Sequence, residues 1–201
     1  MAKNLGLEIR GKLGDKIYTS YLGRPYVRRM PDSIANPRTE AQQAHRNSFA
    51  TVSRLSSDLK AAHQIGLYKH AQRENLTTFS DFRKLNKNKC VGTVVSYPYV
   101  MVSKGPVDVV NIKSVELDNQ HVLRVTFDGE VTDKNKDDVL ALYVYCPALR
   151  TCLPLQPVLR PTGMIAEELP EEFVGHDLHL YGFMQNKDLR TSETLYEKIT
   201  D

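Results

Sequence analysis

The sequence has few cysteines and no long apolar segment. No apolar run approaches the roughly 18–20 residues that a membrane-spanning helix needs. The N-terminal residues, MAKNLGLEIRGKLGDK, also lack the apolar core of a secretory signal. These absences argue against membrane insertion and export, so we expect a cytoplasmic protein. An odd number of cysteines without an export signal favours reduced thiols, although Cys146 and Cys152 flank a short turn segment that would let them face each other.

The common catalytic motifs are missing as well. No glycine-rich loop of the phosphate-binding type follows a buried strand, and no serine stands in a nucleophile-elbow pattern. The acidic run at 167–172 is typical of a solvated loop, because catalytic carboxylates normally converge from different elements. Cys90 lies close to Lys87 and Lys89, which would lower its pKa, but a buried, unreactive cysteine is the favoured interpretation.

Six histidines are scattered along the chain. If one helix continued past Gly66, then His63, His70 and Glu74 would share a face on which a metal ion could bind, although a solvated face broken by glycine is favoured. A strand would place His176 and His179 on opposite faces. We therefore predict no catalytic, cofactor-binding or metal-binding residues, no cofactor and no small-molecule substrate.

Charge divides the chain into two halves. Residues 1–105 hold 18 lysines and arginines against 7 acidic residues, a net charge of +11, whereas residues 106–201 hold 9 against 17, a net charge of −8. A basic half attracts phosphates or an acidic partner, and the two halves can attract each other. We predict a basic hairpin-plus-helix region at 1–105 and an acidic β-sandwich at 106–201, to which residues 94–102 contribute a further strand.

The basic half shows one hairpin and two helices. Residues 16–21 and 26–29 are rich in β-formers around a turn at 22–25, where Pro25 belongs at the turn or on an edge strand. Asn36 and Pro37 are typical of a helix cap and a first helical position, and an apolar stripe continues to a stop at Gly66. A second helix is expected at about 79–89, with Thr78 or Ser80 as its cap.

After Cys90 the pattern changes to short runs rich in Val, Leu and Tyr, separated by turn-formers. Strand signals at intervals of about 8–12 residues indicate an antiparallel, immunoglobulin-like β-sandwich, so the fold class is α+β. The predicted runs are 94–102, 107–117, 121–127, 139–146, 152–159, 164–169, 177–184 and 194–199.

Several of these segments resemble an uncharacterised protein family of gut Bacteroidetes, which has a glycine-flanked hairpin, an NPRTEAQ helix start and a β-rich C-terminal domain. The resemblance rests on residues 11–14, 21–29, 36–46, 102–105 and 179–183. The chain has Tyr21 where the family favours tryptophan. No activity is assigned to this family, so the resemblance implies none for this chain. The helix start is also similar to helix starts in phage-derived proteins of structural role.

We therefore expect a non-enzymatic interaction or assembly protein that binds a protein partner or itself. Its helix start suggests a phage or a mobile element as one origin. The alternative is a nucleic-acid-binding protein that uses the same basic half, in which tyrosines lie among the cations. The predicted contact surface consists of Arg24, Arg28, Arg29, Arg38, Gln42 and Arg46.

Overall fold

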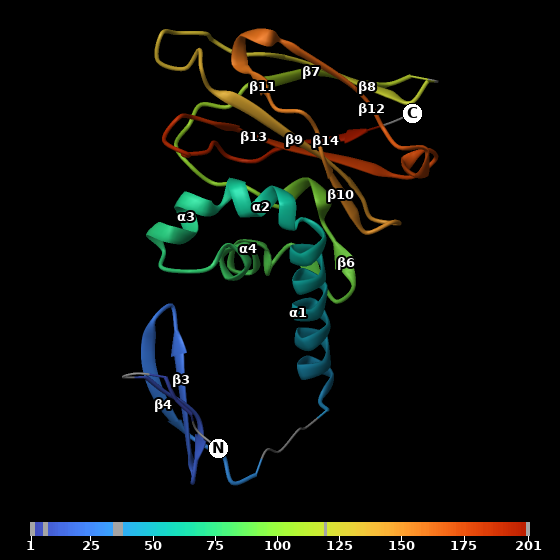
Figure 1. Cartoon of the computed structure of the whole chain (residues 1–201). Coiled ribbons are helices and arrows are strands. Elements are labelled where there is room, and N and C mark those ends of the chain that lie inside the picture. The colour runs from blue at the N-terminus through green and yellow to red at the C-terminus, as the bar shows by residue number, and fades with distance from the viewer. Residues whose placement is uncertain (1–2, 6–7, 34–37, 119, 200–201) are drawn as a thin grey trace. The chain divides into compact units, whose positions relative to one another are not determined.

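The computed structural model describes residues 3–5, 8–33, 38–118 and 120–199. The chain forms two compact units, residues 1–42 and residues 43–201, which divide in the first turn of a helix (Figure 1). Both units contain antiparallel sheets, and the second also contains helices, so the α+β prediction is confirmed. No helix in the described part of the chain is both long and apolar enough to cross a membrane.

The first unit contains a four-stranded antiparallel sheet, and the predicted hairpin forms half of it. Its strands, in the order β1-β2-β3-β4, are Lys3–Leu5, Glu8–Leu13, Lys16–Tyr21 and Arg24–Arg29. The turn between β3 and β4 has positive φ angles at Leu22 (49°) and Gly23 (77°), as a tight two-residue hairpin requires. Pro25 lies on β4 at the end of the strand order, where its missing N–H leaves no gap in a central ladder.

The predicted long helix is broken into shorter helices. It forms α1 (Glu40–Asp58) and α2 (Lys60–Gly66), and two further helices follow, α3 (Tyr68–Arg73) and α4 (Thr78–Asn86). The expected cap at Asn36 and Pro37 lies outside the described residues; at the start of α1, the Thr39 hydroxyl accepts a weak hydrogen bond from the Gln42 N–H at 3.4 Å. A helix does end at Gly66, as predicted, although the φ of Gly66 is not positive; a side chain at this position would collide with the carbonyl of Val102.

Helix α4 confirms the second predicted helix and corrects its cap. We expected Thr78 or Ser80, whereas the Thr77 hydroxyl accepts the hydrogen bond from the Ser80 N–H at 3.1 Å. Thr77 has an extended backbone (ψ 152°), which is the usual conformation of a capping residue. Phe82 then faces inward and is completely buried, as its place in the predicted apolar stripe requires.

The predicted strands after residue 105 form two antiparallel sheets. One is five-stranded and contains β9 (Val139–Cys146), β10 (Thr151–Pro154), β11 (Val158–Leu159), β13 (Leu178–Gln185) and β14 (Leu195–Ile199). The other has the order β12-β8-β7 and contains β7 (Asn111–Leu117), β8 (Val122–Asp128) and β12 (Met164–Glu168). Short 3-10 helices follow β11 and β12 at Arg160–Thr162 (η2) and Glu171–Phe173 (η3).

The predicted strand at 94–102 does not join either large sheet. Its first residues form β6 (Val94–Val95), which pairs only with β5 (Cys90–Val91) in a small ribbon. The 3-10 helix η1 (Tyr97–Tyr99) follows, because Pro98 suits the start of a helix and supplies no ladder N–H.

The five-stranded sheet of the second unit lies between the helices and the three-stranded sheet (Figure 1), and each of its faces contributes to a separate hydrophobic core. Between the two sheets, Leu142 and Leu180 pack against Val125 and Phe127 of β8. On the other face, Tyr181 and Phe183 pack with apolar residues of the helices, including Leu59 and Phe82. Because helices and sheet share this second core, the compact units divide at Gln42 and not near residue 105, where the charge changes sign.

The three cysteines are free thiols. Cys146 belongs to the core between the sheets, whereas Cys152 packs in the core under the helices. Cys152 is paired in register with Tyr145 and not with Cys146, so the two sulfurs point to opposite faces of the sheet. A disulfide between them would require the strands to rearrange.

Candidate functional site

The sheet of the first unit has one basic face that carries tyrosines. Paired residues of neighbouring strands point to the same side of a sheet, and residues alternate along each strand. The pairings Lys12–Ile17, Ile17–Arg28, Thr19–Tyr26 and Tyr21–Arg24 therefore define one face. We call it the basic face, and it consists of Lys12, Ile17, Thr19, Tyr21, Arg24, Tyr26 and Arg28.

The polar and aromatic groups of the basic face are open to solvent. Arg24 and Arg28 are exposed, and the exposed fractions of Tyr21 and Tyr26 are 47% and 48%. Neither arginine forms an ion pair with a residue that the structure describes. The face can therefore offer positive charge and flat aromatic surface together.

Arg29, which we predicted as part of the same contact surface, points to the opposite side of the sheet. It is paired in register with Lys16, and its guanidinium lies 3.8 Å from the carboxylates of both Asp15 and Asp32. Exposed pairs of this kind contribute little stability, about 0–1 kcal/mol. They nevertheless partly neutralise Arg29, so it is not equivalent to Arg24 and Arg28.

The other predicted contact residues do not belong to the sheet. Gln42 lies in the first turn of α1, and Arg38 precedes that helix. Arg46 is part of the second compact unit. Arg38 and Arg46 both interact with other groups of the chain. Of the six predicted residues, the structure brings Arg24 and Arg28 together on one face.

The residues considered for a metal site each have a different partner. The Nε2 of His63 lies 2.8 Å from the Ser56 carbonyl, and the ring packs against Phe82. Burial lowers the pKa of His63, which favours the neutral ring. Glu74 instead forms an ion pair with Lys84 at 2.9 Å. The described residues contain no group of three or more His, Cys, Asp or Glu side chains that could hold a metal ion.

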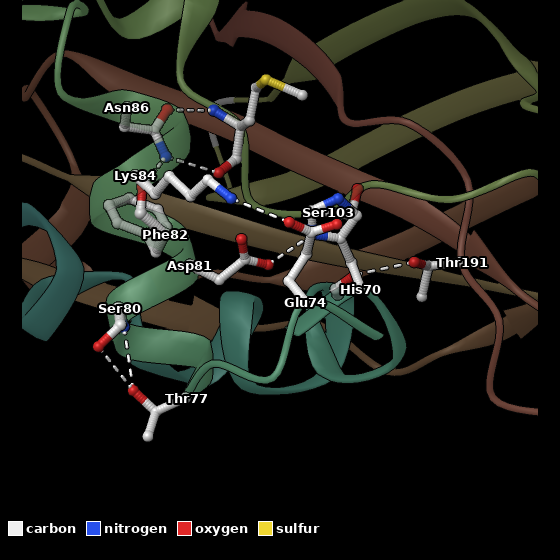
Figure 2. Close-up of polar contacts among 12 residues, drawn as sticks. His70, Glu74, Thr77, Ser80, Asp81, Phe82, Lys84, Asn86, Ser103 and Thr191 are labelled. Atoms are coloured by element: carbon white, nitrogen blue, oxygen red, sulfur yellow. Dashed lines mark hydrogen bonds and ion pairs between the residues drawn. The ribbon is translucent and has the colours of Figure 1, made fainter. Parts of the chain in front are cut away.

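His70 forms the closest acid–base contact of the helical region. Its Nδ1 lies 2.6 Å from Oδ2 of Asp81, which comes from α4 and is completely buried (Figure 2). A buried carboxylate needs a hydrogen-bonding partner, and His70 supplies it. Asp81 was not predicted, because an aspartate in the first turn of a helix is typical of a solvated residue near the positive end of the helix dipole.

His176 and His179 line the same cavity, although alternation along a strand would place them on opposite faces. Strand β13 begins at Leu178, so His176 lies in the preceding loop, and both histidines line a cavity of about 670 Å³. The ring of His179 stacks on Tyr97 at 4.1 Å, and its Nδ1 hydrogen-bonds the Tyr196 hydroxyl at 2.9 Å. The acidic neighbour Asp177 is paired with Lys198. The ring of His179 is therefore held in place by stacking and by a hydrogen bond.

Cys90 differs from a reactive cysteine. Its exposed fraction is 2%, and desolvation raises the pKa of its thiol, which disfavours the thiolate. The pKa of Cys90 is therefore raised and not lowered as Lys87 and Lys89 would suggest, and the cysteine is buried, as the favoured interpretation expected.

Comparisons with known proteins give a family but no activity. A search of curated proteins and a search of solved structures found no match. A family model described as a family of unknown function, DUF6266, matches residues 8–197, which is nearly the whole chain and includes parts of both compact units. The chain belongs to this family, DUF6266.

Proposed function

We propose that this chain is a non-enzymatic assembly protein that associates with further copies of itself through the basic face. The observation that carries the proposal is the lack of a core in the first unit: none of the residues 10–33 and 38–42 is buried. Small sheets need an apolar face packed on another element for independent stability. Tyr21 and Tyr26 of the basic face are about half exposed, so a partner can supply the missing contacts.

A second copy offers a complementary acidic patch. Glu168 ends β12, and Glu171 and Glu172 follow in η3. All three are exposed, and none forms an ion pair with a described residue. Attraction between this acidic patch and the basic face would steer association and fix its register. Because the two surfaces are different, repeated association produces rings or filaments.

Sedimentation velocity over a range of concentrations tests this proposal. We expect oligomers that grow with concentration and dissociate in 0.5 M salt, because salt screens exposed charges. The double variant Arg24→Glu/Arg28→Glu should be monomeric. Arg29→Glu is the matched control, because the same strand presents Arg29 on the opposite face.

A charge exchange makes the test specific. The variant Glu171→Lys/Glu172→Lys should also be monomeric alone, but it should associate when it is mixed with Arg24→Glu/Arg28→Glu. A wild-type chain that stays monomeric at every concentration, or an Arg29→Glu variant that dissociates equally, would contradict self-assembly through this face.

Nucleic-acid binding is the second candidate, and the tyrosines favour it. Tyr21 and Tyr26 lie on the same face as Arg24, Arg28 and Lys12. Bases stack on exposed aromatic rings while cations neutralise the phosphates, and each stacked base contributes about 1–3 kcal/mol. Single-stranded DNA or RNA should then bind at low salt, weaken steeply as salt rises and lose affinity in Tyr26→Ala. Unlike self-assembly, this binding should be insensitive to Glu171→Lys/Glu172→Lys.

The finer expectations from the sequence stay predictions. They are an immunoglobulin-like relation between the two sheets, an origin in gut Bacteroidetes, a phage or mobile-element ancestry and a cytoplasmic location. The two cores on the five-stranded sheet are compatible with a sandwich, and the family match supports membership of an uncharacterised family.

A further inference from the structure

A cationic cavity lies beside the His70–Asp81 pair. Its volume is about 630 Å³, within the range of small-molecule sites. Three segments line it: helix α3, residues 104–106 and the loop that precedes β14. Its cations are Lys69, Arg73, Lys104 and Arg190.

The charges of this cavity are not neutralised by ion pairs. None of the four cations lies within ion-pair distance of a carboxylate that the structure describes. Asp188 and Glu193 also line the cavity, which leaves an excess of two positive charges when the hydrogen-bonded pair of His70 and Asp81 is counted as neutral overall. Such a surplus inside one concave surface favours an anion of about two charges.

His70 adds a directed polar group. Its side chain is about nine-tenths buried, and its Nδ1 is held by Asp81 (Figure 2). Its Nε2 forms no hydrogen bond with any described residue, although the ring lines the cavity. When it carries a proton, this nitrogen can donate a hydrogen bond to a P–O⁻ oxygen.

The walls of the cavity are held together by backbone contacts. The Thr191 hydroxyl donates to the Gly66 carbonyl at 2.8 Å, and the Val107 N–H donates to the Thr191 carbonyl at 3.1 Å. A side chain at Gly105 would collide with that same carbonyl, so glycine permits the close approach of the two loops. The cations are therefore carried on a preorganised frame, which reduces the entropic cost of binding.

We propose that this cavity binds a small phosphorylated molecule through its phosphate group. A phosphate dianion matches the surplus charge, and its oxygens can contact several cations at once while His70 fixes the orientation. Arg190 and Arg73 suit paired hydrogen bonds to phosphate oxygens, whereas Lys69 and Lys104 act as point charges. This site is separate from the basic face and does not depend on self-assembly.

Isothermal titration calorimetry on the full chain at low ionic strength tests the site with three probes: inorganic phosphate, a hexose phosphate and acetate. We expect the hexose phosphate to bind more tightly than inorganic phosphate, and acetate to bind weakly or not at all. Lys104→Gln and Arg190→Gln should each weaken binding of the hexose phosphate about tenfold, as the loss of a charged hydrogen bond does. Lys113→Gln is the matched control, because Lys113 lies on β7 and not in the cavity.

A spectroscopic readout separates binding by His70 from a merely structural role. In the wild-type chain, the hexose phosphate should shift the ¹⁵N resonance of His70 Nε2, while Nδ1 stays bound to Asp81. The proposal is overturned if neither phosphate probe binds at 10 mM, if Lys113→Gln weakens binding as much as Lys104→Gln, or if the Nε2 resonance does not respond. Stronger binding of acetate would assign the cavity to carboxylates and would also overturn it.

Discussion

The two compact units differ in how far they bury the side chains of their sheets. The second unit buries apolar residues on both faces of its five-stranded sheet, whereas no residue at 10–33 or 38–42 in the first unit is buried. Both units consist largely of antiparallel strands, so secondary structure alone does not explain the difference. What differs is the presence of a second layer, which removes apolar side chains from water.

The tyrosines illustrate the same contrast. Tyr21 and Tyr26 are about half exposed, whereas Tyr181 is completely buried and donates its hydroxyl hydrogen to the Tyr97 carbonyl at 2.9 Å. Burial raises the pKa of Tyr143 to about 12 and also raises that of Tyr145, because the phenolate is disfavoured away from water. One residue type therefore serves as core in one unit and as available surface in the other.

Separating the units should produce the largest effect. We expect a peptide of residues 1–42 to be unfolded when it is alone and dilute, because none of its residues 10–33 and 38–42 is buried. A chain of residues 38–201 should keep the circular dichroism and cooperative melting of its two cores. A peptide that folds alone as a monomer would contradict this difference between the units, and so would a shortened chain that fails to fold.

Truncating one apolar side chain in each unit should give unequal losses of stability. Phe82→Ala removes a completely buried ring from the core under the helices and should lower the free energy of unfolding by about 3–5 kcal/mol. Val27→Ala, at a site that is 52% exposed, should change it by no more than about 0.5 kcal/mol. Urea unfolding followed by circular dichroism measures both, and equal losses would refute the contrast.

Acid should weaken the second unit through its buried histidines. Burial lowers the pKa of His63 and His179 below the ordinary value of 6.5, so the unfolded chain takes up protons at a higher pH than the folded chain does. Their contribution is complete above about pH 6.5 and is lost as the pH falls towards the folded pKa values. Urea unfolding at pH 7.5 and 5.5 should show this loss.

Two glutamine variants test whether His63 causes this loss of stability at low pH. His63→Gln keeps a donor for the Ser56 carbonyl but does not titrate, so it should reduce the loss of stability between the two pH values. His45→Gln, at an exposed position of α1, should leave the loss unchanged. If both variants behave like the wild type, His63 is not a source of the acid sensitivity.

Removing the cap of α4 should produce the smallest effect. Thr77→Ala loses the hydrogen bond to the Ser80 N–H and should lower the free energy of unfolding by about 1 kcal/mol. Thr93→Ala, at an exposed position outside any helix, is the matched control. A Thr77→Ser variant should recover most of the loss, and its failure to do so would point to packing of the Thr77 methyl group.

The parts of the fold that the sequence predicts are those governed by local patterns. Strand β9 has the predicted bounds of 139–146, because a run of Val, Leu and Tyr is buried along nearly all of its length. The hairpin of β3 and β4 also follows from its residues, since Gly23 suits a turn with positive φ. Alternation within these strands and their turn chemistry agree with the tertiary structure.

The parts that the sequence could not predict depend on contacts between distant segments. The close approach of Gly66 to Val102 involves a segment far along the chain, and the buried Asp81 is hydrogen-bonded to His70 of another helix. Of the predicted contact surface, Arg24 and Arg28 share a face, but alternation along β4 turns Arg29 away. The cavity beside His70 was not expected at all, because its cations come from three separate segments.

The opposite orientations of Cys146 and Cys152 provide two native reporters in a single chain. A thiol reagent that modifies Cys152, or Cys90 in the same core, detects separation of the helices from the sheet, whereas modification of Cys146 requires the two sheets to part. The order in which the two sulfurs react during unfolding would therefore reveal which layer opens first, without any engineered label.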